Sequence, residues 1–310
     1  MAYPPVTVLI PAYNASGTIE RALSSVWCQN YPEVEVIIVD DGSIDDTSHR
    51  VEKMGTANLR LIRLDQNRGV ATAMNIGIRE ARTEYIAFLD ADDEWLPNKL
   101  RRQLVVIDAQ PEMSFISCGS QVVDLRGRIV ATFGLELPPY GPSDFWRALL
   151  RKSYVAKPTV VARRIKLLET GGFEESLKIS EDQDLWIKLA LNGEVGFVSE
   201  VLVRIYQTSD SLMNRFGGCE DEFSLPMIRS HLSRLGSRLS RREVRQILGE
   251  RYARTGRNVY YRGHPSRGAM LLLRAMLLGN RPLENLGYLV SAAPPMIRFK
   301  RRFRRLNTLQ

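Results

Sequence analysis

The sequence predicts an α/β protein with a mostly parallel sheet flanked by helices, followed by an all-helical C-terminal region. Three observations support this prediction. Over the first 112 residues, short β-rich apolar runs alternate with segments of helical periodicity. From 113 to about 210, shorter strand and helix signals mix, and beyond 220 the strand signals vanish. With 310 residues, 44% hydrophobic and 25% charged, the composition is that of a globular protein.

The first half of the chain alternates regularly between the two element types. Strands are expected at Val6–Ile10, Val34–Val39, Leu59–Leu64 and Tyr85–Leu89. Helices are expected at 19–27, 45–54, 70–78 and 97–109, where apolar residues recur every three or four positions. Each strand is followed by a helix, and this order is typical of parallel strands joined by helical crossovers.

The rest of the chain is less regular. Strands are expected at Phe115–Val123, Ile129–Phe133, Val195–Val198 and Leu202–Tyr206, with helices starting near 164 and spanning 184–190. Further helices are expected at about 221–235, 241–262, 266–279 and 281–291. We therefore divide the chain into a domain of residues 1–212, with halves 1–112 and 113–212, and a helical region of residues 213–310.

Charge separates the two regions. Residues 211–310 contain 20 Lys and Arg but only 6 Asp and Glu, whereas residues 1–210 carry a net negative charge. An acidic N-terminal region argues against nucleic-acid binding there. A basic C-terminal region favours an anionic partner or a solvated helical surface.

Several classes of protein are disfavoured by what the sequence lacks. Three scattered cysteines and three isolated histidines do not make a disulfide framework or a zinc site. We find no stretch typical of a membrane span or signal peptide, and expect a cytoplasmic protein. The first strand is followed by neither a Walker A sequence nor a Gly-x-Gly-x-x-Gly run, which disfavours P-loop NTPases and Rossmann dehydrogenases.

Acidic residues follow two of the expected parallel strands. Asp90 and Asp92 come directly after the fourth strand, and two such carboxylates can hold Mg²⁺ or Mn²⁺ together with substrate phosphate and water. Asp40 and Asp41 follow the second strand. Each pair has an equally simple structural explanation, because Asp residues also favour turns and helix N-termini.

The combination of motifs is more specific than any one of them. Val8-Leu-Ile-Pro-Ala-Tyr-Asn14, Val36-Ile-Ile-Val-Asp-Asp-Gly-Ser43, Asn67-Arg-Gly69 and Phe88-Leu-Asp-Ala-Asp-Asp93 stand in order, followed by Gly171-Gly-Phe-Glu-Glu175 and Glu181-Asp-Gln-Asp-Leu-Trp186. This set, covering about residues 5–210, resembles the inverting, non-processive glycosyltransferases of family 2, which have the Rossmann-like GT-A fold. The resemblance makes 1–112 the nucleotide-sugar half and 113–212 the acceptor half.

The resemblance also implies roles for individual residues. Asp92 with Asp90 would hold the metal, Asp182 would be the general base, and Glu181 and Trp186 would lie on the acceptor side. The nucleotide-sugar would contact Pro11, Tyr13, Asn14, Asp40, Asp41, Arg68, Asp90, Ala91 and Trp95. Trp95 would present its ring to the sugar, whereas Trp186 has the alternative of lying in the core.

The chemistry of inversion fits these roles. An acceptor hydroxyl attacks the anomeric carbon as a nucleoside diphosphate leaves, so one carboxylate must take the hydroxyl proton. Asp182 also stands where a helix N-cap is expected, and the two roles are compatible. One departure is Tyr206, which occupies the position where many relatives carry a histidine near the metal or diphosphate.

The C-terminal tail mixes basic and apolar side chains over residues 296–306. This pattern suits an anionic membrane surface, which would place the protein peripherally on the inner face of the cell membrane. A charged terminus without a partner is the alternative. We expect a UDP-sugar donor and a glycan or lipid-linked glycan acceptor. The alternatives are a sugar nucleotidyltransferase and a non-catalytic protein that binds a nucleotide-sugar or a membrane surface.

Overall fold

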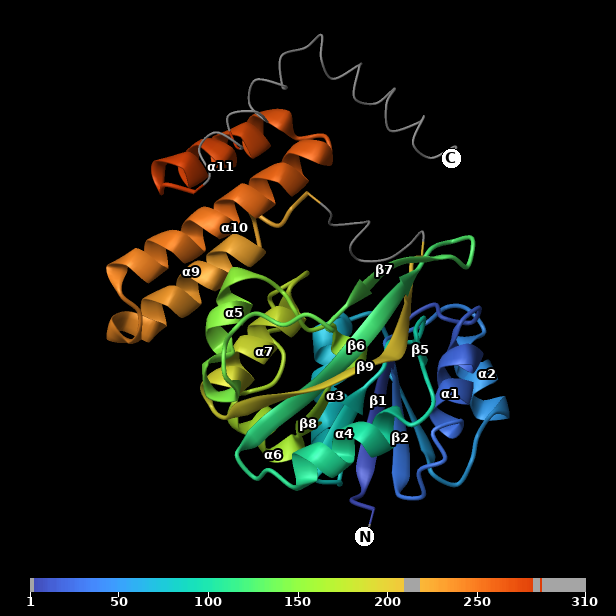
Figure 1. The fold of residues 1–310 in the computed structure, drawn as a ribbon. Coiled ribbons are helices and arrows are strands. Elements are labelled where there is room, and N and C mark those ends of the chain that lie inside the picture. Colours follow the sequence, from blue (N-terminus) through green and yellow to red (C-terminus); the bar gives the residue numbers. More distant parts are fainter. Residues whose placement is uncertain (1–2, 209–217, 281–284, 286–310) are drawn as a thin grey trace. The chain divides into compact units, whose positions relative to one another are not determined.

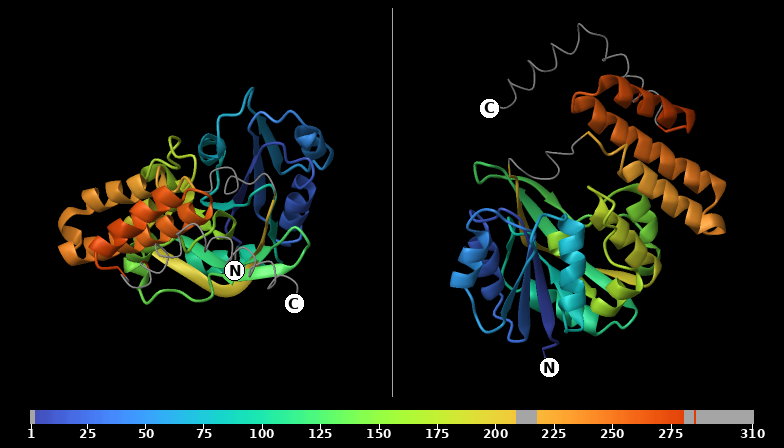
Figure 2. Two further views of the ribbon diagram at one scale, coloured as in Figure 1. Left: turned by 90° about the horizontal axis from the view of Figure 1, so that it is seen from above. Right: turned by 180° about the vertical axis from the view of Figure 1, so that it is seen from behind.

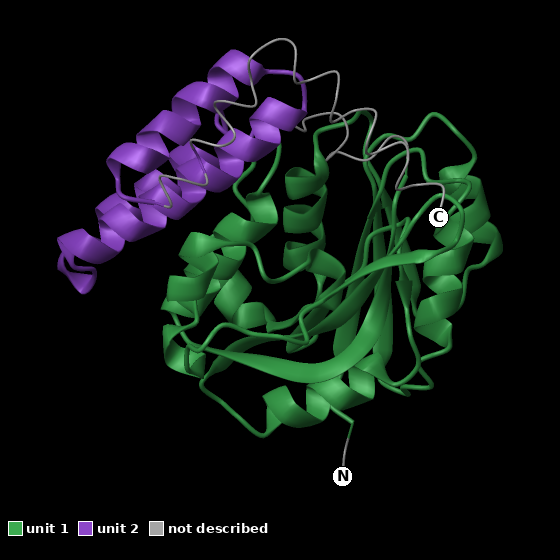
Figure 3. Cartoon of the chain, turned by 45° about the horizontal axis from the view of Figure 1, so that its top comes forward, with its two compact units in different colours: residues 1–211 green, residues 212–310 purple. Residues whose placement is uncertain are grey.

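The computed structural model describes residues 3–208, 218–280 and 285. The chain divides into two compact units, Met1–Ser211 and Leu212–Gln310, which are coloured separately in Figure 3. Each unit is described by itself.

The described residues of unit 1 form one nine-stranded sheet with the order β3-β2-β1-β4-β8-β6-β9-β5, and β7 pairs with β6 beside this path. The first four strands are parallel, as predicted: β1 (Val6–Ala12), β2 (Val34–Asp40), β3 (Leu59–Arg63) and β4 (Tyr85–Phe88). Their carboxyl ends therefore lie at the same edge of the sheet.

The second half of the sheet is mixed. It contains β5 (Glu94–Trp95), β6 (Met113–Val123), β7 (Ile129–Phe133), β8 (Val161–Arg163) and β9 (Glu194–Tyr206). The short strand β8 runs antiparallel to both β4 and β6, whereas β9 runs parallel to β6. The prediction of two closing strands was wrong, because β9 is continuous through 199–201. Its register against β6 shifts around Gly119, where an added Cβ would lie 2.8 Å from the Glu200 carbonyl oxygen.

Helices lie on both sides of this sheet (Figures 1 and 2). Four of them join or follow the parallel strands, close to the predicted bounds: α1 (Ile19–Trp27), α2 (Thr47–Lys53), α3 (Val70–Glu80) and α4 (Lys99–Asp108). The second half adds α5 (Trp146–Arg151), which was not expected, α6 (Arg164–Glu169) and α7 (Glu181–Leu191).

Successive side chains of the buried strands point to opposite faces of the sheet and form a hydrophobic layer on each face. Val8 and Ile10 belong to a cluster with the apolar faces of α1 and α4. Leu9 points the other way, toward α3, where a Cβ on Gly77 would fall 2.0 Å from its Cδ1. Glycine at this position lets the helix backbone lie close to the sheet.

Unit 2 is helical in its described part, with α9 (Ser224–Leu235), α10 (Arg241–Tyr261) and α11 (Pro265–Leu277) near their predicted positions. Ser240 and Glu243 form a reciprocal capping box at the start of α10. The predicted helix at 281–291, save for the single described residue Asn285, and the basic tail at 296–306 lie outside the described residues. Within the described ranges, no helix has the length and apolarity needed to cross a membrane.

Candidate functional site

The ends of β1 and β2 are tied to each other by their own loops. Asn14 has a left-handed backbone (φ 49°), and its side-chain Oδ1 accepts a hydrogen bond from the Ile44 N–H at 3.0 Å. The Asn14 N–H donates to the Ser43 hydroxyl at 2.9 Å. Pro11 is buried in β1, while the Tyr13 side chain is 41% exposed beside this junction. The two loops thus form one rigid surface at the carboxyl edge of the sheet.

The first acidic segment, residues 40–43, is satisfied internally. Asp40 is fully buried, and its two oxygens accept hydrogen bonds from the Ser43 N–H and the Ser48 hydroxyl. The expectation that Asp40 contacts a base was therefore wrong, because the fold itself occupies both oxygens. Gly42 follows at φ 73°, where a Cβ would lie 2.6 Å from the Gln66 backbone.

Asp41 holds the segment that precedes α3. Its carboxylate oxygens accept the backbone N–H groups of Arg68 and Gly69 at 2.7 and 2.8 Å. Burial raises the pKa of Asp41, and these two hydrogen bonds oppose the shift. The Arg68 side chain is exposed beside this bridge, so Asp41 fixes where the Arg68 backbone lies.

The second acidic segment, residues 90–93, follows β4 and brings three carboxylates close together. Burial and the charge of Asp90 raise the pKa of Asp92. Burial and the charges of Asp90 and Asp92 raise the pKa of Asp93 well above its ordinary value. Asp93 accepts one hydrogen bond, from the Tyr206 N–H at 3.0 Å. Ala91, between the carboxylates, is buried.

Lys157, which sequence reasoning missed, connects this segment to the start of α7. It belongs to a 3-10 turn (Lys157–Thr159), and its Nζ lies 2.6 Å from Asp90 Oδ1 with the side chain 10% exposed. Burial disfavours the ammonium, yet the charges of Asp90, Glu181 and Asp182 raise the pKa of Lys157 above its ordinary value. The Lys-Pro dipeptide has no motif that would have revealed this position.

The start of α7 carries two carboxylates with raised pKa values. Burial and the Asp182 charge raise the pKa of Glu181 to about 7. Burial also raises the pKa of Asp182, against the attraction of Lys157. One Asp182 oxygen accepts the Gln183 N–H at 2.7 Å. Because the charges of both Lys157 and Asp90 act on Asp182, the structure brings the predicted base and the second acidic segment into one electrostatic environment.

Both tryptophans assigned to the site lie in the core. Trp95 is 2% exposed, its Nε1–H donates to the Pro158 carbonyl at 2.9 Å, and the Lys99 ammonium lies 4.1 Å from its ring centroid. The expectation that its ring faces a sugar was wrong. Trp186 is fully buried and packs against Phe88, with ring centroids 5.7 Å apart. Its assignment to the acceptor side was likewise wrong, and the core alternative is correct.

Tyr206 takes part in a local network beside the second acidic segment. Its hydroxyl donates to Glu94 at 2.7 Å, and the Arg21 guanidinium lies 3.8 Å from its ring centroid. Arg21 also donates to the Asp92 carbonyl oxygen. The Arg21 guanidinium thus links Tyr206 to the main chain of the second acidic segment.

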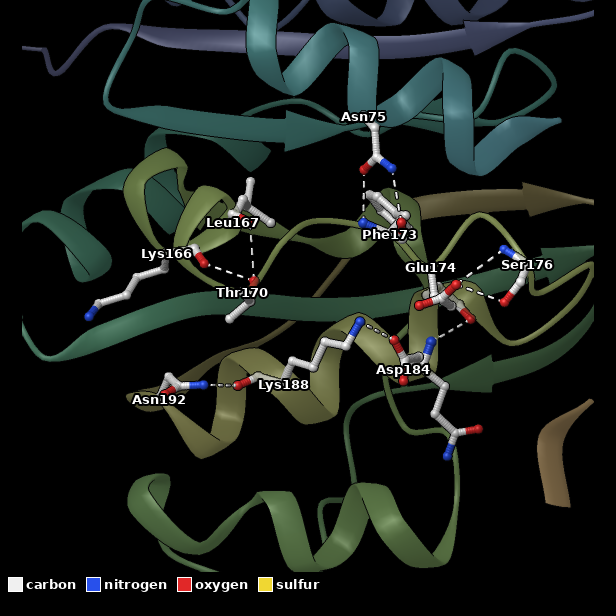
Figure 4. A network of polar contacts seen from close by, with 12 residues as sticks. Asn75, Lys166, Leu167, Thr170, Phe173, Glu174, Ser176, Asp184, Lys188 and Asn192 are labelled. Carbon is white, nitrogen blue, oxygen red and sulfur yellow. Dashed lines mark hydrogen bonds and ion pairs between the residues drawn. The ribbon is translucent and has the colours of Figure 1, made fainter. Parts of the chain in front are cut away.

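The glycine-rich segment at 171–175 is joined to α3. Figure 4 shows the Asn75 side chain pointing to the main chain at Phe173, where its amide makes two hydrogen bonds of 2.9 and 2.8 Å. Asn75 and Thr72 also donate to the Glu175 carboxylate. At Gly172 (φ 72°) a Cβ would lie 2.4 Å from the Asn75 Oδ1, so glycine is required for this approach. Asn75 thereby links the two halves of unit 1.

The donor set of the second acidic segment suits a hard divalent cation. Among the described residues, no three Asp, Glu, His or Cys side chains converge as a complete ligand set. Mg²⁺ and Mn²⁺ are commonly held by one or two carboxylates, with substrate phosphate and water completing the shell. Burial first, and then the charges of the neighbouring aspartates, raise the pKa of Asp92 and Asp93, and a bound cation would offset both effects. The residues present therefore fit such an ion.

Comparison with known proteins gives consistent results. Residues 7–154 match the model of "Glycosyl transferase family 2". The chain is 30% identical over 190 residues to the Escherichia coli "UDP-Glc:alpha-D-GlcNAc-diphosphoundecaprenol beta-1,3-glucosyltransferase WfaP", covering 61% of this chain and 71% of that protein.

Two solved structures share the fold. S. aureus TarS 1-349 in complex with UDP-GlcNAc superposes with a TM-score of 0.67 at 22% identity, covering 88% of this chain and 81% of that one. The mannosyltransferase PcManGT from Pyrobaculum calidifontis, in complex with GDP-Man and Mn2+, has a TM-score of 0.61 at 21% identity, covering 96% and 83%.

Proposed function

Because the chain belongs to glycosyltransferase family 2 and has the GT-A fold, we propose that it transfers one sugar from a UDP-sugar to an acceptor hydroxyl with inversion. The chain is a glycosyltransferase, and what is proposed here is its donor, stereochemistry, cation and acceptor. The family assignment disfavours the sugar nucleotidyltransferase alternative.

One observation carries the mechanism. Asp182 and the second acidic segment lie close enough for Asp90 and Lys157 to act electrostatically on Asp182. A base on one side of the anomeric carbon and a charge-stabilising group on the other are the requirements of direct displacement. The raised pKa of Asp182 makes its carboxylate a better proton acceptor than an exposed aspartate.

In the proposed step, Asp182 accepts the proton of the acceptor hydroxyl while that oxygen bonds to the anomeric carbon. The bond from this carbon to the diphosphate oxygen breaks on the opposite face, so the configuration inverts. Asp92 and Asp90 would hold Mg²⁺ or Mn²⁺, which would neutralise the leaving diphosphate. Pro11, Tyr13, Asn14, Asp41 and Arg68 belong to the edge where the nucleotide would bind. Tyr13, Asn14 and Arg68 are exposed and would contact it, whereas the buried Pro11 and Asp41 would shape that edge.

The proposed acceptor is a lipid-linked or cell-surface oligosaccharide intermediate. Support comes from the E. coli relative, whose name specifies a diphosphoundecaprenol acceptor. The donor is proposed to be a UDP-sugar because that relative is named for UDP-Glc and the TarS structure is a complex with UDP-GlcNAc. Attachment to the inner face of the cell membrane, through the tail at 296–306, is part of the same proposal.

Replacing Asp182 by Asn tests the mechanism. We expect transfer to fall about 10²–10⁴-fold, while nucleotide-sugar affinity measured by calorimetry stays within a few-fold. Asp184→Asn is the matched control, because Asp184 lies in the same helical turn but pairs with Lys188 at 2.6 Å. Full transfer by Asp182→Asn would refute its role as base.

A donor screen tests the remaining assignments. Thermal shift with UDP-, GDP- and dTDP-sugars, each with and without Mn²⁺, should give a metal-dependent shift with a UDP-sugar. A shift that needs no metal would contradict the role given to Asp90 and Asp92. No shift with any donor, in a folded sample, would favour the non-catalytic alternative.

A further inference from the structure

The hairpin of unit 1 that contains β7 exposes several large apolar side chains. In what we call the β7 hairpin (residues 120–133), Leu125 is 75% exposed, and Ile129, Val130 and Phe133 are each more than half exposed. Because alternate side chains of a strand point to opposite faces, neither face of β7 is covered by unit 1. Several large exposed apolar side chains on one short hairpin favour an interaction site there.

The root of the β7 hairpin adjoins the proposed site. Val123, the last residue of β6, pairs with Tyr206, and its carbonyl accepts the Gln207 N–H at 2.9 Å. The Tyr206 N–H in turn donates to Asp93 at 3.0 Å. The turn of the hairpin therefore leaves the sheet at the same edge as the second acidic segment.

The exposed charge of the turn is basic. Asp124 is paired within the turn, because Arg128 donates to it from both Nε and Nη2, at 2.9 and 2.8 Å. Arg126 is exposed between Leu125 and Gly127. Basic and apolar side chains presented together suit the interface of an anionic bilayer, where apolar groups enter the headgroup region and arginines meet lipid phosphates.

We propose that the β7 hairpin docks unit 1 onto an anionic phospholipid surface, with Leu125, Ile129 and Val130 entering the headgroup region. This inference rests on the proposed lipid-linked acceptor, whose hydroxyl must reach Asp182 from a bilayer. A hairpin rooted beside the acidic segment brings the site to the membrane surface where such an acceptor lies.

Vesicle flotation of the full chain tests the docking. The probe is vesicles of phosphatidylcholine and phosphatidylglycerol at about 7:3. Ile129→Thr with Val130→Thr keeps β-branching, and we expect it to weaken vesicle binding about tenfold. The matched control is Val105→Thr with Ile165→Thr, which removes the same groups from positions on α4 and α6 that are each 56% exposed. Equal binding by both variants would overturn the proposal.

An environment-sensitive fluorophore separates the β7 hairpin from the basic tail. It is attached to Val130→Cys, or to Val105→Cys as control, in a chain where Cys28 and Cys219 are replaced by Ser. We expect vesicles to shift the emission to the blue at position 130 alone. If emission at position 130 shifts to the blue without vesicles as the protein concentration is raised, the β7 hairpin pairs with a second copy of the chain. If dilute protein without vesicles already emits further to the blue at position 130 than at position 105, residues 212–310 cover the β7 hairpin. Either result would overturn the proposal.

Donor binding by the same variants keeps the two proposals distinguishable. The Ile129→Thr, Val130→Thr chain should bind the UDP-sugar with unchanged affinity, because neither residue belongs to the donor edge. Vesicle docking without donor binding would refute the proposed function and leave the bilayer contact standing. Donor binding without any difference between the two Thr variants would refute the docking alone.

Discussion

The two acidic segments of unit 1 begin alike, but they differ in how far the protein itself supplies hydrogen bonds to their carboxylates. Both follow a buried parallel strand, and they place two aspartates (40–43) and three aspartates (90–93) at the same edge of the sheet. In residues 40–43, all four carboxylate oxygens of Asp40 and Asp41 accept hydrogen bonds from the protein. In residues 90–93, burial and mutual repulsion raise the pKa of Asp92 and Asp93.

The difference shows how neighbours decide the role of a carboxylate. A carboxylate whose oxygens are filled by backbone N–H and hydroxyl donors holds a loop in place. A buried carboxylate surrounded by others gains stability when a cation or a proton arrives. The first segment is therefore a structural clamp in this chain, and the second is the better place for a charged ligand.

Asp92→Asn, in the second acidic segment, should have the largest effect on sugar transfer. We expect sugar transfer to fall about 10²–10³-fold, or about 3–4 kcal/mol of activation free energy, because the proposed cation loses a ligand. The melting temperature at pH 8 should stay equal or rise, since the variant removes a charge that burial disfavours. Transfer rates and thermal melts of the same preparation check both parts, and unchanged transfer would contradict the assignment.

Lys157→Met removes the ammonium that pairs with Asp90. We expect the free energy of unfolding to drop by about 2–4 kcal/mol at pH 8, because buried carboxylates lose their compensating charge. The loss should be smaller at pH 5, where Glu181 is protonated. Urea denaturation at both pH values measures it. The control is Lys166→Met, whose pair with Glu169 is partly exposed to solvent and should contribute under about 1 kcal/mol.

Asp40→Ala breaks the structural clamp instead. The buried Ser43 N–H and the Ser48 hydroxyl lose their acceptor, which should lower the free energy of unfolding by about 2 kcal/mol. Asp40→Asn keeps one acceptor oxygen and should cost less. Denaturant melts separate the two variants, and the remaining folded protein should transfer sugar at the normal rate. If Asp40→Asn were stable but inactive, this would support the predicted contact of Asp40 with the nucleotide base, which its burial argues against.

Glu181→Gln should have the smallest effect, and its sign depends on pH. The folded-state pKa of about 7 lies above the ordinary value of 4.5, so the folded state holds the proton longer. Stability of the native chain should therefore fall as pH rises from about 4.5 to 7. The variant should be more stable by about 1–2 kcal/mol at pH 8 and equal near pH 4. Thermal melts across this range measure it, and a destabilised variant at pH 8 would contradict the raised pKa.

Strong local periodicity explains how much of the fold could be predicted. The alternation in residues 1–112 gave the parallel strands β1 to β4 and their helices to within a few residues. Short elements were missed, because β5 and β8 contain two and three residues and have no period of their own. The continuity of β9 also escaped prediction, since a register shift beside Gly119 has no signature in the β9 sequence.

The candidate site was only partly accessible from sequence. Motif order pointed to Asp90, Asp92 and Asp182, whose roles stay predictions, but it could not tell which aspartates the fold would satisfy, as Asp40 illustrates. Trp95 stands two residues after the acidic segment, yet in β5 its ring is buried in the core, where the Pro158 carbonyl accepts its N–H. Lys157 could not be predicted from sequence, because it is close to the carboxylates of residues 90–93 and of the start of α7 only in the folded chain.

The Asn75 amide has a consequence for how unit 1 folds. Because one side chain of α3 completes the main-chain hydrogen bonding at Phe173, 98 residues along the chain, the early half holds a polar group that only the later half can satisfy. If residues 1–112 were expressed alone, Asn75 would lack these hydrogen-bond partners. The edge of β4 that pairs with β8 in the whole unit would also be left unpaired. The two halves should therefore melt in one calorimetric transition, and splitting the gene between them should yield fragments that are soluble only when produced together.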